Sequence, residues 1–205
     1  MPNTLDSGSD TNRSRIRNVV VAAILICAMA IVISRWAQQV RDVRGKQFPS
    51  VSLQPLTGNA EVVNTDDLVG KVVLINFWGT WCPPCRLELP QIVQIYEKYQ
   101  GNQDFLLLSV SCGQGEEDKE SLRQNTESML QSEGIDMPTY ADPSFASRAA
   151  VADAIGFTAY PTTFVLDRKG VIQGEWVGYH SSAGAEMEQL VGKLLESDLE
   201  KPEGN

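Results

Sequence analysis

The chain has 205 residues, 42% of them hydrophobic, and a formal net charge of −9 at pH 7. This length and composition leave room for one domain with a substantial core and for some additional sequence. From residue 45 onward there are 23 acidic and 11 basic residues, a net charge of −12, which argues against nucleic acid or anionic lipid as a partner of that part of the chain.

The first feature along the chain is an apolar segment. Residues 1–12 are polar, three arginines follow, and residues 19–33 form an unbroken apolar run. As a helix this run would be roughly 22 Å long, which is short for a hydrocarbon core of about 30 Å, but flanking arginines can extend to the interface. We interpret residues 19–36 as an uncleaved signal anchor that crosses the lipid bilayer, preceded by a cytoplasmic tail at residues 1–18.

A cleaved signal peptide is the alternative interpretation of this segment. Ala28-Met29-Ala30 matches a small-x-small cleavage site, although cleavage there would leave Ile31-Val32-Ile33 at the mature N-terminus. The numbers of arginines and lysines on the two sides of the apolar run do not decide its orientation. A short N-terminal segment before a single apolar run is nevertheless the usual layout of a signal anchor with an exported domain.

The remaining sequence is predicted to form a linker at residues 37–47, a folded domain at residues 48–197 and a flexible tail at residues 198–205. Two short strands, at residues 51–53 and 60–63, are expected to form a hairpin at the start of the domain.

The centre of the domain follows a strand–helix–strand pattern. Residues 72–78 indicate a buried strand, residues 87–99 an amphipathic helix and residues 105–110 a second strand, which implies parallel pairing of the two strands. The later elements are predicted in this order: a polar loop at residues 113–124, a surface helix ending near 133, a helix at 145–155, a hairpin of strands at 160–166 and 171–177, and a closing helix at 183–197.

Cys82-Pro83-Pro84-Cys85 lies between the first central strand and the helix. Cysteines at a helix N-terminus face unpaired backbone N–H groups and the positive end of the helix dipole, which favour a thiolate. Cys82 is therefore the predicted nucleophile, and Cys85, one turn further on, is the predicted resolving thiol of a disulfide-exchange centre. Pro83 and Pro84 stiffen the loop but remove two N–H donors, so the strength of this effect is open.

A zinc site and a structural disulfide are the alternatives for such a cysteine pair. The other candidate ligands are Cys27, Cys112 and His180, and they contain no second closely spaced pair. Redox chemistry is therefore favoured, with the Cys82–Cys85 disulfide as the reactive group and no cofactor or metal. We expect Cys112 to be a buried small residue and His180 to lie on a surface loop.

The chain resembles the thioredoxin superfamily over residues 48–197. It combines a strand, a Cys-x-x-Cys and a helix with Pro161 at the start of a later strand and with a final hairpin and helix. The segment from Phe77 to Pro90, FWGTWCPPCRLELP, is similar to the membrane-anchored TlpA/ResA-type thiol reductases, which face the bacterial periplasm or the cell exterior. The resemblance implies an α/β thioredoxin-like fold, with a central mixed sheet flanked by helices and an N-terminal β-hairpin extension.

The resemblance also implies roles for residues outside the cysteine pair. Tyr160-Pro161-Thr162 matches the family's cis-proline loop, so we expect a cis bond before Pro161 and main-chain groups of Tyr160 that bind a substrate peptide. Trp78 and Trp81 are expected to lie beside the dithiol. Trp81 should be the more exposed of the two and should contact substrate.

Glu88 is the expected acid–base residue. Asn76 stands where thioredoxin has a buried Asp that aids proton transfer, and an amide cannot accept that proton. In the TlpA/ResA group a Glu three residues after the second cysteine is thought to replace it, here Glu88, and desolvation should raise its pKa. An ordinary Glu on the helix surface is the alternative.

The resemblance implies a thiol-disulfide oxidoreductase that reduces disulfides of exported proteins, with apocytochrome c as the family's best-known substrate and a membrane protein as electron donor. It would be a single-pass protein of the bacterial cytoplasmic membrane, with its soluble domain on the periplasmic or extracellular side. An oxidase of the same fold is an alternative that the reduction potential discriminates. A peroxiredoxin-like peroxidase would need a Pro-x-x-x-Thr-x-x-Cys pattern, which is absent, and copper metallochaperones of this fold use Cys-x-x-x-Cys.

Overall fold

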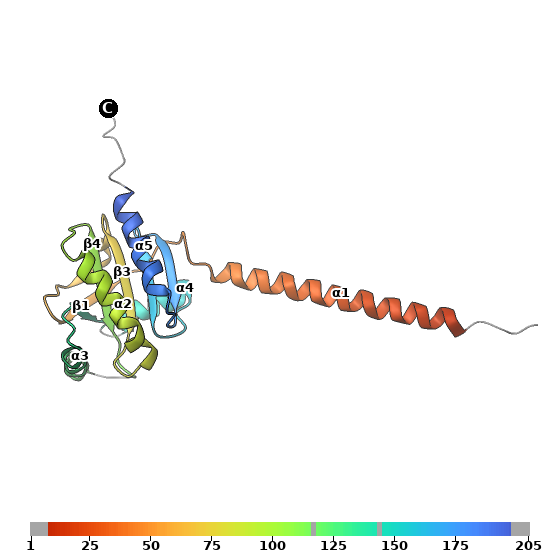
Figure 1. The fold of residues 1–205 in the computed structure, drawn as a ribbon, viewed down its shortest axis with the longest axis horizontal. Helices are drawn as coiled ribbons and strands as arrows, with labels where there is room; N and C mark the ends of the chain where they lie inside the picture. Colours follow the sequence, from red (N-terminus) through yellow and green to blue (C-terminus); the bar gives the residue numbers. More distant parts are fainter. Residues whose placement is uncertain (1–7, 116–117, 143–144, 198–205) are drawn as a thin grey trace, which may run out of the picture. The chain divides into compact units, whose positions relative to one another are not determined.

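A computed structural model describes residues 8–115, 118–142 and 145–197 of the chain. The chain divides into two units between residues 42 and 43 (Figure 1). The second unit therefore begins earlier than the predicted domain start at residue 48. The predicted tail at residues 198–205, and the first seven residues of the predicted N-terminal tail, lie outside the described residues.

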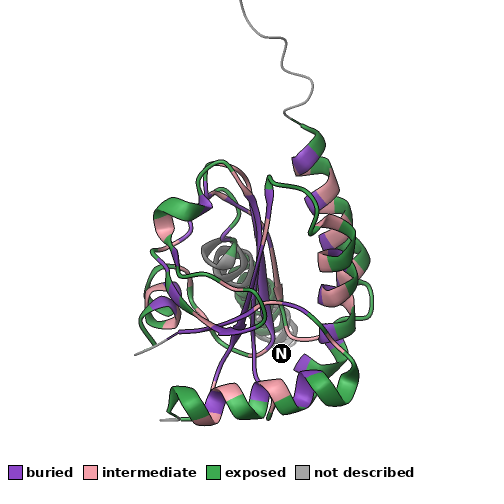
Figure 2. Ribbon diagram, turned by 90° about the vertical axis from the view of Figure 1, so that its left-hand side faces the viewer, coloured by how far each residue is buried: buried purple, intermediate pink, exposed green. Residues whose placement is uncertain are grey.

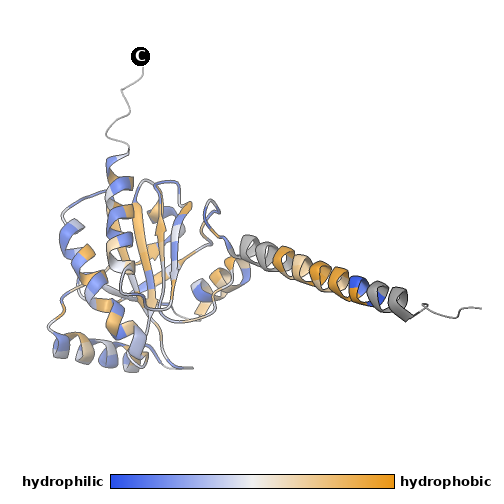
Figure 3. Cartoon of the chain, turned by 45° about the vertical axis from the view of Figure 1, so that its right-hand side comes forward, coloured by the Kyte–Doolittle hydropathy of each residue, from blue (hydrophilic) through white to orange (hydrophobic). Residues whose placement is uncertain are grey.

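The first unit contains the helix α1 (Gly8–Arg41), which extends beyond the predicted signal anchor in both directions. Its stretch Arg15–Val32 has a mean hydropathy of 2.1 over 18 residues and is long and apolar enough to cross a membrane. Figure 3 shows this apolar stretch in the middle of α1. A signal sequence passes the same test of length and composition.

The second unit is built on a seven-stranded mixed sheet in the order β2-β1-β5-β4-β3-β6-β7. Its strands are β1 (Ser52–Thr57), β2 (Val63–Asn64), β3 (Val72–Trp78), β4 (Phe105–Ser111), β5 (Thr139–Ala141), β6 (Thr162–Leu166) and β7 (Ile172–Val177). Its helices are the 3₁₀ helix η1 (Thr65–Leu68) and the α-helices α2 (Pro83–Tyr99), α3 (Lys119–Glu133), α4 (Ala146–Ile155) and α5 (Ala183–Glu196). Figure 2 shows buried central strands and helices whose outer faces are exposed.

β3 is the central strand that leads into the loop with Cys82. It is buried along its whole length, pairs in parallel with β4 and pairs antiparallel with β6, which confirms the predicted strand–helix–strand unit. Successive side chains of a strand point to opposite faces, so Leu74 packs in the cluster with α2 and α5 while Ile75 packs in the cluster with α4. Apolar residues on both faces are what a strand covered by helices on both sides requires.

α2 begins at Pro83, earlier than the predicted start at residue 87. Proline is well suited to the first turn of a helix because its missing N–H would have had no partner there. Leu89, Ile92 and Ile95, spaced by three residues, are buried and join the cluster against the sheet. This packing fixes the N-terminus of α2 at the end of β3.

Two expectations about the remaining elements need correction, and one strand was not expected. β1 pairs with β2 as predicted, through Ser52↔Asn64 and Leu53↔Val63, but β1 continues to Thr57, and residues 60–62 are not a strand. β5 was not predicted, because three residues are too few to show an alternating pattern. α3 begins at Lys119, inside the predicted loop, since the side chain of Asp118 caps it by accepting the N–H of Ser121 at 3.0 Å.

Candidate active site

Cys82 and Cys85 lie at the N-terminus of α2 and form a disulfide, as the sequence predicted for the reactive pair. They are only 3% and 1% exposed. Because Pro83 and Pro84 have no N–H, the first N–H of the helix belongs to Cys85, and it donates to Sγ of Cys82 at 3.3 Å. Sγ of Cys82 is thus held at the N-terminus of α2, where it can undergo thiol-disulfide exchange with the thiol of a partner.

Two aromatic side chains, Trp81 and Tyr160, form what we call the aromatic wall beside the disulfide. Their ring centroids are 5.3 Å apart with an interplanar angle of 79°, an edge-to-face contact. Trp81 is 38% exposed and its Nε1 donates to the carbonyl of Cys112 at 2.9 Å, whereas Trp78 is fully buried. The predicted difference in exposure between the two tryptophans is confirmed.

The Tyr160–Pro161 bond is cis, as predicted. β6 follows directly and pairs with β3 so that Thr162 lies opposite Phe77. This antiparallel register brings Pro161 level with the end of β3, where the loop to Cys82 begins. Trp78 and Pro161, which are 83 positions apart in the chain, thus lie at the same end of two paired strands.

Glu88 is buried rather than on the helix surface, with only 1% exposure. Its Oε2 accepts hydrogen bonds from Nδ2 of Asn76 at 2.7 Å and from Oγ1 of Thr163 at 3.3 Å. Oε1 is buried without a hydrogen-bond partner among the described residues. Burial raises the pKa of Glu88 to about 7, although the hydrogen bonds from Thr163 and Asn76 act to lower it.

A carboxyl group with a pKa near 7 can both accept and donate a proton at neutral pH. Glu88 lies three residues after Cys85 on α2, and side chains at this spacing share one face of a helix. Thr163 was not recognised from the sequence as part of this site. Its place two residues after Pro161, on the strand that pairs with β3, is the signal that could have indicated it.

Cys112 and His180 lie where the sequence predicted. Cys112 is 2% exposed, and burial raises the pKa of its thiol to about 12, so it stays protonated at neutral pH. His180 is exposed, with Nε2 at 3.3 Å from the carbonyl oxygen of Val177. Among the residues that the structure describes, no three His, Cys, Asp or Glu side chains form a group that could hold a metal ion.

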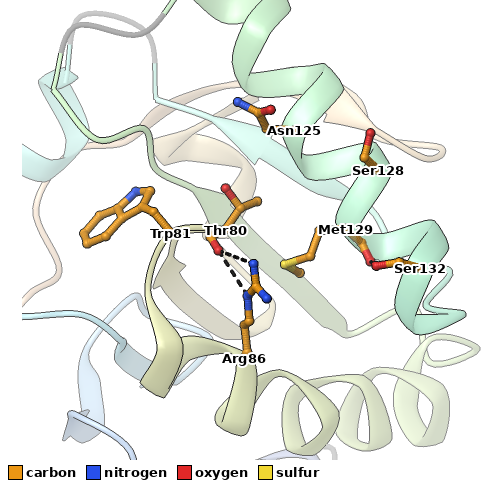
Figure 4. A pocket seen from close by; sticks show the side chains of 7 residues that line it. All are labelled: Thr80, Trp81, Arg86, Asn125, Ser128, Met129 and Ser132. Carbon is orange, nitrogen blue, oxygen red and sulfur yellow. Dashed lines mark hydrogen bonds between the residues drawn. The ribbon is translucent and has the colours of Figure 1, made fainter.

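A surface pocket of about 470 Å³ opens next to the dithiol loop (Figure 4). One side is formed by Thr80, Trp81 and Arg86, and the α3 side is formed by Asn125, Ser128, Met129 and Ser132. Nε and Nη2 of Arg86 donate to the carbonyl of Thr80 at 3.1 and 3.0 Å. This side chain therefore stabilises the loop between β3 and α2. No sequence signal indicated the pocket, because it depends on where α3 packs.

Gly79 is required at its position because any side chain there would displace Trp81. A Cβ added to Gly79 would lie 2.6 Å from Nε1 of Trp81 and 2.8 Å from the carbonyl oxygen of Cys112. We expect Gly79→Ala to break this hydrogen bond and to lower the free energy of unfolding by about 1–3 kcal/mol. Chemical denaturation followed by tryptophan fluorescence measures the change in the free energy of unfolding.

Gly101→Ala is the matched control for this prediction, since a Cβ at Gly101 would meet no atom within 4 Å. It should leave the free energy of unfolding within about 0.5 kcal/mol of the parent. Equal effects of the two substitutions would show that the contact with Trp81 is not the cause.

Comparison with known proteins agrees with this geometry. The sequence profile of the AhpC/TSA family matches residues 44–174. The chain is 32% identical over 145 residues to the thioredoxin-like protein YneN of Bacillus subtilis, covering 71% of this chain and 76% of that protein. It is 31% identical over 159 residues to the thiol-disulfide oxidoreductase ResA of Halalkalibacterium halodurans, covering 78% of each. The chain belongs to the AhpC/TSA family, as a thiol-disulfide oxidoreductase of the ResA type.

The solved structures support the same assignment for this ResA-type protein. A thiol:disulfide interchange protein of the thioredoxin family from Chlorobium tepidum superposes with a TM-score of 0.58 at 28% identity. The alignment covers 75% of this chain and 99% of that one. The predicted α/β thioredoxin-like fold and the predicted enzyme class are confirmed, with Cys82 and Cys85 as the pair that such chemistry requires.

Proposed function

We propose that the protein is a membrane-anchored reductase of disulfide bonds in exported polypeptides. The observation that carries the direction of electron flow is the environment of the Cys82 sulfur. Cys82 is 3% exposed, Pro83 and Pro84 offer it no N–H, and the N–H of Cys85 is the donor directed at it. Burial disfavours a charged thiolate, and the one hydrogen bond that the described residues donate to this sulfur offsets only part of that cost.

Thiolate stabilisation decides which redox state of a dithiol is favoured. Strong oxidants of this kind are strong because their reduced form is stabilised. A Cys82 thiolate with few donors leaves the disulfide as the favoured state, so the reduced pair gives up its electrons readily.

The reaction transfers two electrons from the dithiol to the substrate. The Cys82 thiolate attacks one sulfur of the substrate disulfide, forming a mixed disulfide and releasing the first substrate thiolate. Cys85, after giving its proton to Glu88, attacks the sulfur of Cys82, which breaks the mixed disulfide and releases the second substrate thiolate. The resulting Cys82–Cys85 disulfide needs two electrons and two protons from a dithiol donor, which we assign to a membrane protein.

The N-terminal helix supports the proposed location. An 18-residue apolar stretch is about 27 Å long as a helix, close to the thickness of a hydrocarbon core. This stretch overlaps residues 19–36, which we assign as a signal anchor in the bacterial cytoplasmic membrane, with the ResA-type domain on the periplasmic or extracellular side. Disulfides of exported polypeptides occur on that side. Apocytochrome c is the specific substrate that the family resemblance favours.

The substrate would bind along the aromatic wall and the cis-proline loop. Trp81 is partly exposed beside Cys82, and Tyr160 is half-buried directly before Pro161. Main-chain groups of Tyr160 can pair with an extended peptide as an added strand would.

We expect the Cys82–Cys85 couple of the full-length protein in detergent micelles to have a reduction potential near that of thioredoxin, about −270 mV, or lower. Redox titration followed by thiol alkylation measures it. Cys27 and Cys112 are the free cysteines, so a variant with both changed to Ser makes the alkylation report this couple alone. A potential near about −120 mV, typical of a strong oxidant, would contradict the proposed direction.

A further inference from the structure

A buried ion pair lies at the start of α4. Asp142, which is 7% exposed, follows β5, and its carboxylate accepts the backbone N–H groups of Ser147 and Arg148, each at 2.9 Å. Nε of Arg148 lies 3.5 Å from Oδ2 of the same carboxylate. The side chains of Arg148 and Asp142 are 13% and 1% exposed, so the charged groups are largely removed from water.

Arg148 connects this ion pair to the cis-proline loop. Its Nη1 donates to the hydroxyl of Tyr160 at 2.6 Å. The ring of Tyr160 contacts Trp81 edge to face, and the indole N–H of Trp81 donates to the carbonyl of Cys112. In the aromatic wall, Trp81 is therefore held by the Cys112 carbonyl, and Tyr160 is held by Arg148.

The ring of Tyr160 is enclosed from two sides. Its centroid lies 5.3 Å from that of Trp81 and 5.0 Å from that of Phe157, with edge-to-face angles in both contacts. With its hydroxyl bonded and its ring enclosed, Tyr160 has little freedom to move. The peptide bond to Pro161 is thereby fixed as well.

The cap of α4 does not by itself require a guanidinium. Asp142 already satisfies two N–H groups of the first turn, as a carboxylate at a helix N-terminus does. Burying the arginine costs solvation, and what its planar guanidinium adds is a second donor, which reaches Tyr160 while Nε faces Asp142. A lysine, with a single ammonium group, could not face both partners in the same way.

We propose that Arg148 is a positioning residue for polypeptide substrates. It holds the hydroxyl of Tyr160, and through Tyr160 it fixes the aromatic wall and the cis-proline loop against which the substrate chain binds. This inference rests on the proposed reduction of polypeptide disulfides. Arg148 has no role in the chemistry of the sulfurs, so a small disulfide that does not reach the wall should react independently of it.

The test compares a disulfide-bonded polypeptide, such as insulin, with glutathione disulfide in single-turnover reactions of the pre-reduced full-length protein in detergent micelles. Arg148→Gln removes the guanidinium. Tyr160→Phe removes only the hydroxyl and leaves the ring and the ion pair with Asp142, so it keeps the test valid if Arg148→Gln folds poorly.

We expect each variant to raise the half-saturating polypeptide concentration roughly tenfold and to leave the maximal rate unchanged. A tenfold change corresponds to the loss of one hydrogen bond to a charged group. The double variant should be no worse than either single variant, because both changes remove the same contact. In the Arg148→Gln variant, the reaction with glutathione disulfide and the reduction potential should not change.

Arg168→Gln is the matched control. Arg168 is also partly buried and also pairs with an aspartate, Asp104 at 3.1 Å, but it follows the opposite end of β6 from Pro161. It should leave the half-saturating concentration unchanged.

The Arg148 inference is overturned if the parent reduces the polypeptide and the Tyr160→Phe variant does so equally well. It is also overturned if both substrates slow down alike, or if the effects of the two substitutions add. A parent that reduces glutathione disulfide but not the polypeptide would instead overturn the proposed function, and the inference with it.

Discussion

The Cys85→Ser variant will accumulate as a mixed disulfide with its substrates. Cys82 remains able to attack a substrate disulfide, but no neighbouring thiol is left to break the bond that forms. Turnover should fall below detection, and trapped species should be visible on non-reducing gels of membranes from cells that express the full-length protein. Mass spectrometry of the trapped partners identifies them, and we expect exported polypeptides with apocytochrome c among them.

Two further substitutions establish that trapping occurs through Cys82. Cys82→Ser should trap nothing, because the nucleophile is gone. Cys85→Ser combined with Cys112→Ser should trap as well as Cys85→Ser alone, since Cys112 is 2% exposed and burial holds its pKa at about 12. If Cys112→Ser abolished trapping, the assignment of Cys82 as nucleophile would be wrong. If only cytoplasmic proteins were trapped, the proposed location would be wrong.

Glu88→Gln will change the pH dependence of stability. The unfolded chain loses the Glu88 proton near the ordinary value of 4.5, whereas the folded protein keeps it until its pKa of about 7. The folded state therefore binds more protons between these values, and the free energy of unfolding falls as the pH rises through this window. The difference corresponds to about 3 kcal/mol, fully lost above pH 7.

Glutamine at this position carries no charge at any pH, so the variant should lack this loss. Below about pH 4.5, we expect the free energy of unfolding to depend on pH in the same way in the oxidised parent and in the Glu88→Gln variant. Between that pH and pH 8, the free energy of unfolding of the variant should rise by up to about 3 kcal/mol relative to that of the parent. Urea denaturation across this range measures it. A constant difference at all pH values would contradict the raised pKa.

The same substitution should slow resolution of the mixed disulfide. Glutamine cannot take the proton of Cys85, and a positioned acid–base group contributes about 10²–10⁴-fold to such steps. We expect single-turnover reduction to slow at least about tenfold near pH 7 and to lose its inflection near this pH. Glu97→Gln, an exposed residue on the same helix, is the control and should leave both profiles unchanged. If the inflection near pH 7 persists in the Glu88→Gln variant, it reports the titration of another group.

The sequence by itself determined the features that depend on neighbouring residues. The apolar run from Val72 to Trp78 predicted a buried central strand, and Cys82-Pro83-Pro84-Cys85 before an amphipathic helix predicted the reactive pair at a helix N-terminus. The cis bond at Pro161 was expected from the match of Tyr160-Pro161-Thr162 to the cis-proline loop of the thioredoxin superfamily. These are local patterns, in which spacing along the chain sets which groups lie side by side.

Only the tertiary structure decided what depends on packing between distant segments. Glu88 could have been a surface residue, and it is buried because β6 brings Thr163 beside Asn76 and closes over the carboxylate. In the same way, α4 packs so that Arg148 reaches Tyr160. Burial and the pKa that follows from it are properties of the assembled core, because desolvation is the sum of every segment that excludes water from a group.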